Sequence, residues 1–155
     1  MQTTEHYHQA SYSQISASVI QDVRNTLGVT DWPKRHSSKE FREHLLRSLS
    51  AFGWSNPVRI DQRSKISITS VLDKTGLCLQ TGNMSRFYAD LIKLETLYRK
   101  KIIIGAIYII PTKGFAKELS GNVANFERLV EELQIFDATV TVPLVVFGLS
   151  GRDKQ

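Results

Sequence analysis

The feature that most constrains the fold of this sequence is a nearly unbroken apolar run, IIIGAIYII, over residues 102–110. β-Branched residues dominate the run, and it lacks polar alternation, so it predicts a central strand that is covered on both faces. A helical pattern of apolar residues precedes it over residues 85–100, and a short strand pattern lies before that over residues 77–80. Because strand, helix and strand in this order form a crossover unit, we expect residues 77–81 to lie beside residues 102–110.

The remaining elements flank this crossover unit and predict an α/β fold with a mixed sheet. Asp73-Lys74-Thr75-Gly76 has the composition of a hairpin turn leading into residues 77–80. The glycines at 114 and 121 are interpreted as turns. The other predicted elements are helices over residues 12–27, 41–52 and 122–134 and strands over residues 58–60, 66–71 and 140–147.

Length and composition limit the domain organisation. The 155 residues fit one domain, expected over residues 11–155, and the polar residues 1–10 predict a flexible N-terminal arm. The longest apolar run is too short to cross a bilayer, and the N-terminus lacks the basic start and apolar middle of a secretory signal. The expected compartment is therefore cytoplasmic. The single cysteine, Cys78, allows no internal disulfide.

The charge balance favours a polyanionic partner without identifying one. There are 20 Lys and Arg residues against 15 Asp and Glu residues, which gives a net charge of +5. The basic residues gather in two groups, of which one is Arg99, Lys100 and Lys101 and the other is Lys34, Arg35, His36, Lys39, Arg42 and Arg47. Both groups also fit ordinary solvated helix surfaces, since cations are favourable near a helix C-terminus.

The stretch most informative about chemistry is LCLQTGNMSRFYADLIK, residues 77–93, where a strand ends in a Gln-x-Gly-Asn corner before a basic helix. Over residues 37–115 the order of elements resembles the core of the PD-(D/E)XK nuclease superfamily, and residues 77–113 look closer still to restriction endonucleases of the BglII and BstYI type. The resemblance implies a three-layer sandwich with a central mixed sheet, and Mg²⁺ held by an Asp on the first hairpin strand and a Glu on the second. Gln80 matches the Gln that replaces the usual Lys in that family, and the pattern also includes Gly82, Asn83, Asp90 and Lys93.

The two acids that this resemblance requires are absent. Counting back from Gln80, the position of the Glu ligand holds Cys78, and the position of the Asp ligand holds Thr69 or its neighbour Ser70. Mg²⁺ prefers carboxylate oxygens and water, and a thiol beside a hydroxyl supplies neither the charge nor a suitable donor. Without an ion to polarise the phosphate and activate water, we expect a degenerate catalytic site that needs no cofactor.

Migrated acids are the alternative to a degenerate site. Asp73 in the hairpin and Asp90 on the crossover helix are candidate Mg²⁺ ligands, as are Glu40 and Glu43 on the preceding helix. Each also has an ordinary structural interpretation as a turn, capping or salt-bridged residue. Cys78 offers a nucleophile, but it lies within an apolar strand and has no evident His-Asp partnership, which favours a small buried thiol.

The leading hypothesis is a nuclease-fold protein that binds DNA, or a partner subunit of a restriction or defence system, with an inactive catalytic site. One alternative is an active Mg²⁺-dependent type II endonuclease with a rearranged site such as Asp73, Asp90 and Gln80. Another is a protein-binding module, either an inhibitor or a dimerisation subunit. The expected partners are DNA and a second copy or a heteromeric nuclease subunit, with no membrane. The residues predicted to contact DNA are Lys74, Asn83, Arg86, Lys93 and Lys113.

Overall fold

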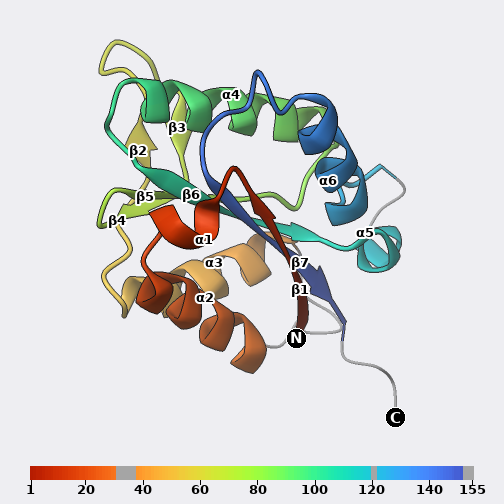
Figure 1. Ribbon diagram of the computed structural model, residues 1–155. Helices are drawn as coiled ribbons and strands as arrows, with labels where there is room; N and C mark the ends of the chain where they lie inside the picture. Colours follow the sequence, from red (N-terminus) through yellow and green to blue (C-terminus); the bar gives the residue numbers. More distant parts are fainter. Residues whose placement is uncertain (31–37, 120–121, 152–155) are drawn as a thin grey trace.

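A five-stranded mixed sheet lies between two layers of helices in the computed structural model, which describes residues 1–30, 38–119 and 122–151 (Figure 1). The strand order is β1-β7-β6-β5-β4; β5, β6 and β7 run parallel, and both edge strands are antiparallel to their neighbours. The predicted α/β sandwich is thereby confirmed. The strands of the sheet are β1 (Gln2–His8), β4 (Ser70–Leu72), β5 (Thr75–Leu79), β6 (Gly105–Pro111) and β7 (Leu144–Ser150), and β2 (Val58–Arg59) pairs separately with β3 (Ser67–Ile68).

The predicted crossover unit is also confirmed. β5 and β6 pair in parallel, from Thr75 opposite Gly105 to Leu79 opposite Ile109, and α4 connects the two strands. Every residue of β6 is buried, because β5 and β7 flank it and helices cover both of its faces. This position explains the unbroken apolar run. The helices are α1 (Ser11–Gln14), α2 (Ala17–Val29), α3 (Ser38–Ser50), α4 (Ser85–Arg99), α5 (Lys113–Leu119) and α6 (Phe126–Ile135).

The two faces of the sheet build two separate apolar cores. Successive side chains of a strand point to opposite faces, so Leu77 and Leu79 pack with α2 and α3, while Cys78 packs with α4 and α6. Figure 1 shows these helix pairs on opposite sides of the sheet. Each fully buried Leu or Phe contributes about 1.5–3 kcal/mol to folding. The alternation also places Gln80, two residues after Cys78, on the α4 side.

The expectation of a flexible arm over residues 1–10 is wrong for Gln2–His8. This segment is β1, which pairs antiparallel with β7 from Gln2 opposite Ser150 to His8 opposite Leu144. Glu5 forms an ion pair with Arg24 of α2 at 2.6 Å, which ties the strand to the helix layer. Because β1 is an edge strand with one free side, its polar composition is tolerated and conceals it in the sequence.

The hairpin turn before β5 is shorter than predicted. Asp73 and Lys74 alone form it, with φ values of 45° and 60°, and Leu72 and Thr75 pair on either side. Positive φ at both central residues is the geometry of a type I′ turn, which Asp tolerates well. Gly76 belongs to β5, where an added Cβ would lie 3.1 Å from the Ile103 side chain.

Two helix predictions change in the structure. The single helix expected over residues 12–27 is interrupted at the extended Ile15 and becomes α1 and α2. The turn expected at Gly114 is instead part of α5, which buries Phe115 and Ala116 against the end of the sheet, whereas the turn expected at Gly121 lies outside the described residues. Within the described residues, no helix has the length and apolarity needed to cross a bilayer.

Candidate functional site

A pocket of about 600 Å³ opens at the carboxyl end of β5. α3 contributes one wall and α4 the other, and the corner that follows β5 forms the floor between them. This is the corner where the sequence predicts the site. Three cationic side chains and one carboxylate line the pocket, so its charge is positive, and its polar lining includes Arg42, Thr69, Gln80, Arg86, Asp90 and Lys93.

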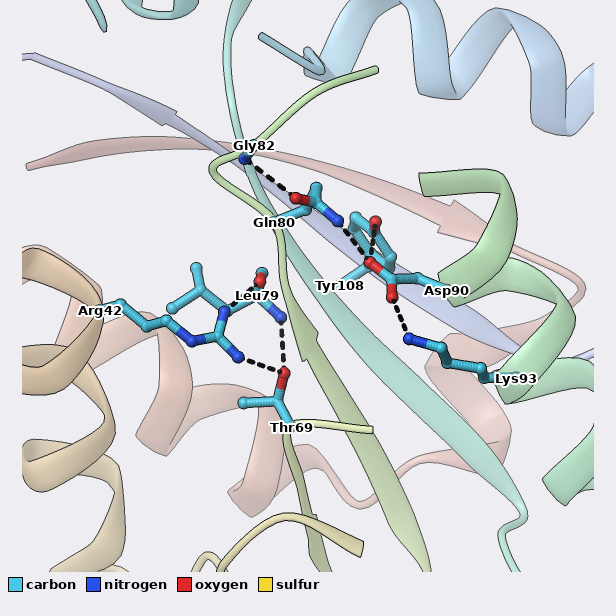
Figure 2. Close-up of polar contacts among 8 residues, drawn as sticks. All are labelled: Arg42, Thr69, Leu79, Gln80, Gly82, Asp90, Lys93 and Tyr108. Carbon is cyan, nitrogen blue, oxygen red and sulfur yellow. Dashed lines mark hydrogen bonds and ion pairs between the residues drawn. The ribbon is translucent and has the colours of Figure 1, made fainter. Parts of the chain in front are cut away.

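Asp90 is the centre of a hydrogen-bonded network on the α4 side of the pocket. Its Oδ2 accepts from Gln80 Nε2 at 2.7 Å and from the Tyr108 hydroxyl at 2.9 Å, and its Oδ1 lies 3.2 Å from Lys93 Nζ (Figure 2). Gln80 Oε1 in turn accepts from the Gly82 amide at 2.9 Å. A buried carboxylate is stable only when paired and hydrogen-bonded, and these donors meet that need. Asp90 and Gln80 are therefore engaged in holding the corner together.

Cys78 of β5 and Tyr108 of β6 are register partners in neighbouring parallel strands. Burial raises the pKa of both groups, and the nearby Asp90 carboxylate raises each pKa further. Cys78 packs in the apolar core next to α4 and does not line the pocket. The prediction of a small buried thiol is confirmed. The reactive form of cysteine is the thiolate, and the raised pKa of Cys78 disfavours that form.

Arg42 reaches the sheet from α3, on the other side of the pocket. Its Nη1 donates to the Leu79 carbonyl at 2.6 Å and its Nη2 to Thr69 Oγ1 at 3.3 Å (Figure 2). Thr69 Oγ1 also accepts from the Leu79 amide at 3.2 Å. Ser70 does not line the pocket, and its hydroxyl donates to the Ser55 carbonyl. Of the two residues considered for the Asp position, Thr69 is therefore the one that faces the pocket.

The donor set at this corner does not fit Mg²⁺. Thr69 and Leu79 present neutral oxygens, and both of these oxygens already accept hydrogen bonds from Arg42. Cys78, at the position of the second acid, is a buried thiol outside the pocket. In the part of the chain that the structure describes, no cluster of three or more His, Cys, Asp or Glu side chains is arranged to hold a metal. The one carboxylate that lines the pocket, Asp90, is already engaged by Gln80, Tyr108 and Lys93, so a hard cation here would lack the carboxylates that it requires.

The candidate migrated acids do not converge on the pocket. Asp73 is exposed in the turn at the far end of the β4–β5 hairpin from Gln80, whereas Asp90 lines the pocket. Glu40 and Glu43 are exposed on α3 and are not among the residues that line it. A metal site shared by Asp73 and Asp90 therefore has no geometric support.

The predicted DNA-contacting residues fall into different environments. Arg86 and Lys93 line the pocket, whereas Lys74 is exposed in the hairpin turn with Asp73. Asn83 Oδ1 accepts a hydrogen bond from the Ser85 N–H at 3.0 Å, which satisfies a backbone donor at the start of α4. Lys113 is exposed at the start of α5, and its backbone N–H donates to Glu127. Lys34, Arg35 and His36 of the predicted basic group lie outside the described residues.

Sequence reasoning missed the site roles of Arg42 and Tyr108. Arg42 was visible only as one of several basic residues, and its contacts with Thr69 and Leu79 depend on how α3 docks against the sheet. Tyr108 carries the one side-chain hydroxyl of the otherwise apolar strand β6. In the parallel register it lies opposite Cys78, which would have placed it beside the predicted site.

Comparison with known proteins identifies the family of the chain. The sequence matches the family described as restriction endonuclease BglII/BglIII over residues 4–149. The chain belongs to this family. The match extends from β1 into β7, so it covers nearly all of the sheet and confirms the predicted BglII-type resemblance.

Individual proteins that are similar to this chain are distant from it in sequence. The type II restriction enzyme OkrAI of Oceanobacter kriegii is 22% identical over 130 residues, with 72% of this chain and 67% of that enzyme covered. The crystal structure of BglII complexed with a DNA 16-mer has a TM-score of 0.83 at 14% identity, covering 96% of this chain and 76% of that one. Free BglII gives a TM-score of 0.78 at 15% identity, with coverages of 100% and 82%. The structural similarity therefore establishes the shared restriction-endonuclease-like fold.

Proposed function

We propose that this chain binds DNA through the pocket at the end of β5 and does not cleave it. The observation that carries the proposal is the composition of the pocket, which is lined by Arg42, Arg86 and Lys93. Thr69 and Cys78 stand at the positions where the family resemblance expects the two metal-binding acids. The site thus keeps groups that attract a phosphate backbone and lacks groups that would anchor a hydrolytic metal ion.

Cations in a pocket favour binding over cutting. Lys and Arg neutralise phosphates and release condensed counterions, which gives affinity that falls as salt rises. Metal-dependent hydrolysis would also require an ion to polarise the phosphate and to generate hydroxide. Because Asp90 accepts hydrogen bonds from Gln80 and Tyr108 and pairs with Lys93, it is poorly placed to serve as a metal ligand instead.

The proposed cellular role is that of a DNA-binding subunit in a restriction or defence system, acting in the cytoplasm. A homodimer would bind DNA without cleaving it, whereas a heteromer with a catalytically competent nuclease subunit would gain from that subunit the acids that this chain lacks. In the second case this chain would position the DNA, and the partner would cut it.

The direct test is duplex-DNA binding measured by fluorescence anisotropy over a range of salt concentrations. Arg86→Gln should lower affinity about tenfold and reduce the salt slope by about 1, as expected for a lost phosphate contact. Arg99→Gln is the matched control, since Arg99 is an exposed arginine at the other end of α4 that pairs with Glu95 and does not line the pocket. Equal losses for the two variants would contradict a role for the pocket.

A plasmid-cleavage assay with Mg²⁺ or Mn²⁺ tests the second half of the proposal. The purified chain should leave the plasmid intact in both metals. Cleavage that disappears in the Asp90→Asn variant would contradict the proposal and support a rearranged acidic site. If the chain shows no salt-dependent DNA binding and forms a stable oligomer, the protein-binding module is the better description.

A further inference from the structure

Arg42 occupies a special position in the pocket. It is half-buried in the second turn of α3, and its guanidinium crosses to the end of β5. There it donates to two oxygen atoms of the sheet, the Leu79 carbonyl and Thr69 Oγ1. The planar guanidinium is thus fixed at two points (Figure 2). A fixed guanidinium loses less conformational freedom on binding a ligand than a free side chain does.

One acceptor of Arg42 lies at a position that the family resemblance assigns to metal binding, and the other lies next to such a position. Thr69 stands at the position of the missing Asp, and Leu79 lies between Cys78, at the position of the missing Glu, and Gln80. Arg42 therefore places a permanent positive charge where the resemblance expects a divalent cation. A second cation at the same oxygens would be repelled by the guanidinium and would find no carboxylate there.

The opposite wall supplies two further cations. Arg86 and Lys93 lie on α4 and line the same pocket as Arg42 on α3, so positive charge faces the pocket from both helix layers. Asp90 offsets part of this charge through its 3.2 Å contact with Lys93. Arg42 has no carboxylate partner among its described contacts, which are the Leu79 carbonyl and the Thr69 hydroxyl. Its charge is thus available to an anion in the pocket.

We infer that Arg42 replaces the divalent metal ion as the cation that binds a backbone phosphate of DNA in this pocket. The inference rests on the proposed DNA-binding function. It adds that Arg42 is the group that binds the phosphate and that this binding needs no metal ion. A guanidinium binds a phosphodiester through charge-assisted hydrogen bonds. It does not lower the pKa of a bound water as a metal ion does, so the phosphate is held without generation of a hydroxide nucleophile.

The first test measures duplex-DNA affinity in EDTA for Arg42→Gln and Arg42→Lys. Arg42→Gln should weaken binding about 10- to 100-fold and lower the salt slope by about 1. Arg42→Lys should bind between the wild-type chain and Arg42→Gln, because it keeps the charge and loses the planar fork. Arg47→Gln is the control on the same helix, as Arg47 is exposed and outside the pocket lining. Arg42→Gln binding as well as Arg47→Gln would overturn the inference.

The second test uses Thr69→Asp and decides the question even if Arg42→Gln fails to fold. A carboxylate at residue 69 should pair with Arg42 and cancel its charge, so DNA affinity in EDTA should fall about tenfold or more. Added Mn²⁺ should not restore it, and the electron paramagnetic resonance signal of Mn²⁺ should remain that of the free ion. Mn²⁺ binding with recovered affinity would overturn the inference, because the metal position would then be open. If the wild-type chain shows no salt-dependent DNA binding, the proposed function fails first.

Discussion

Gln80 Nε2 donates a 2.7 Å hydrogen bond to Asp90 Oδ2 and thereby connects the end of β5 to α4. The same amide accepts from the Gly82 N–H through its Oε1 atom. Gln80 is thus bonded on both ends of its amide, within a corner where the family resemblance expects a catalytic side chain. Through this bond Gln80 forms a structural link between β5 and α4.

Gln80→Glu should make stability depend on pH. A second carboxylate beside Asp90 in a buried setting is repelled by it, so the introduced carboxyl should have a pKa above the ordinary value of about 4. The folded variant then holds a proton that the unfolded chain releases, and its free energy of unfolding falls as pH rises above about 4. Urea unfolding at several pH values, compared with the wild-type chain, measures the effect. Gln80→Leu is the control and should lose stability equally at each pH.

Asp90→Asn should destabilise the fold by about 1–3 kcal/mol, because Lys93 loses its ion-pair partner and Tyr108 loses a charged acceptor. The free energy of unfolding from urea titration provides the measurement. Asp61→Asn removes a carboxylate from a surface contact with the exposed side chain of Arg63 and serves as the control. Equal stability of the Asp90→Asn variant and this control would show that the network does not support the corner.

Tyr108 should remain protonated in the folded protein at alkaline pH. Burial and the neighbouring Asp90 carboxylate raise its pKa above the ordinary value of about 10. Unfolding then releases a proton from Tyr108 once the pH exceeds about 10, so stability falls as pH rises beyond that point. Phenolate absorbance should reach the same amplitude in the wild-type chain and in Tyr108→Phe until unfolding begins. One additional phenolate in the folded wild-type chain would contradict the burial of this hydroxyl.

Cys78 should resist thiol reagents in the folded state. The thiol is buried and its pKa is raised, first by burial and then by the Asp90 carboxylate, so the reactive thiolate is scarce. A chromogenic disulfide reagent should label the native chain only at the rate of unfolding. In denaturant it should label one thiol per chain, which matches the single cysteine of the sequence. Rapid labelling of the native chain would contradict the packing of Cys78 against α4.

The sequence predicts the central strands of the fold because buried strands consist mainly of apolar residues. β6 is flanked by strands and covered on both faces, so it reads as a continuous apolar run. β1 was missed because an edge strand with polar side chains resembles a flexible segment. α5 was missed because it is short and has Gly114, a residue that favours turns, in its first turn.

The candidate site could be located from the sequence but not assembled from it. Gln80 and Asp90 lie ten residues apart and face each other because the chain turns between β5 and α4, which the resemblance anticipates. Arg42 lies 37 residues from Leu79, and no local pattern determines that α3 brings the guanidinium to this carbonyl. Contacts of this kind depend on the docking of whole layers, which residue spacing does not encode.

The most direct measurement is the DNA affinity of the wild-type chain in EDTA and in millimolar Mg²⁺ at matched ionic strength. With Arg42 as the phosphate-binding cation, the dissociation constant should be the same in the two buffers, and the DNA should be recovered intact. A dissociation constant that falls when Mg²⁺ is present, or cleavage of the DNA, would show that a metal ion still enters the pocket.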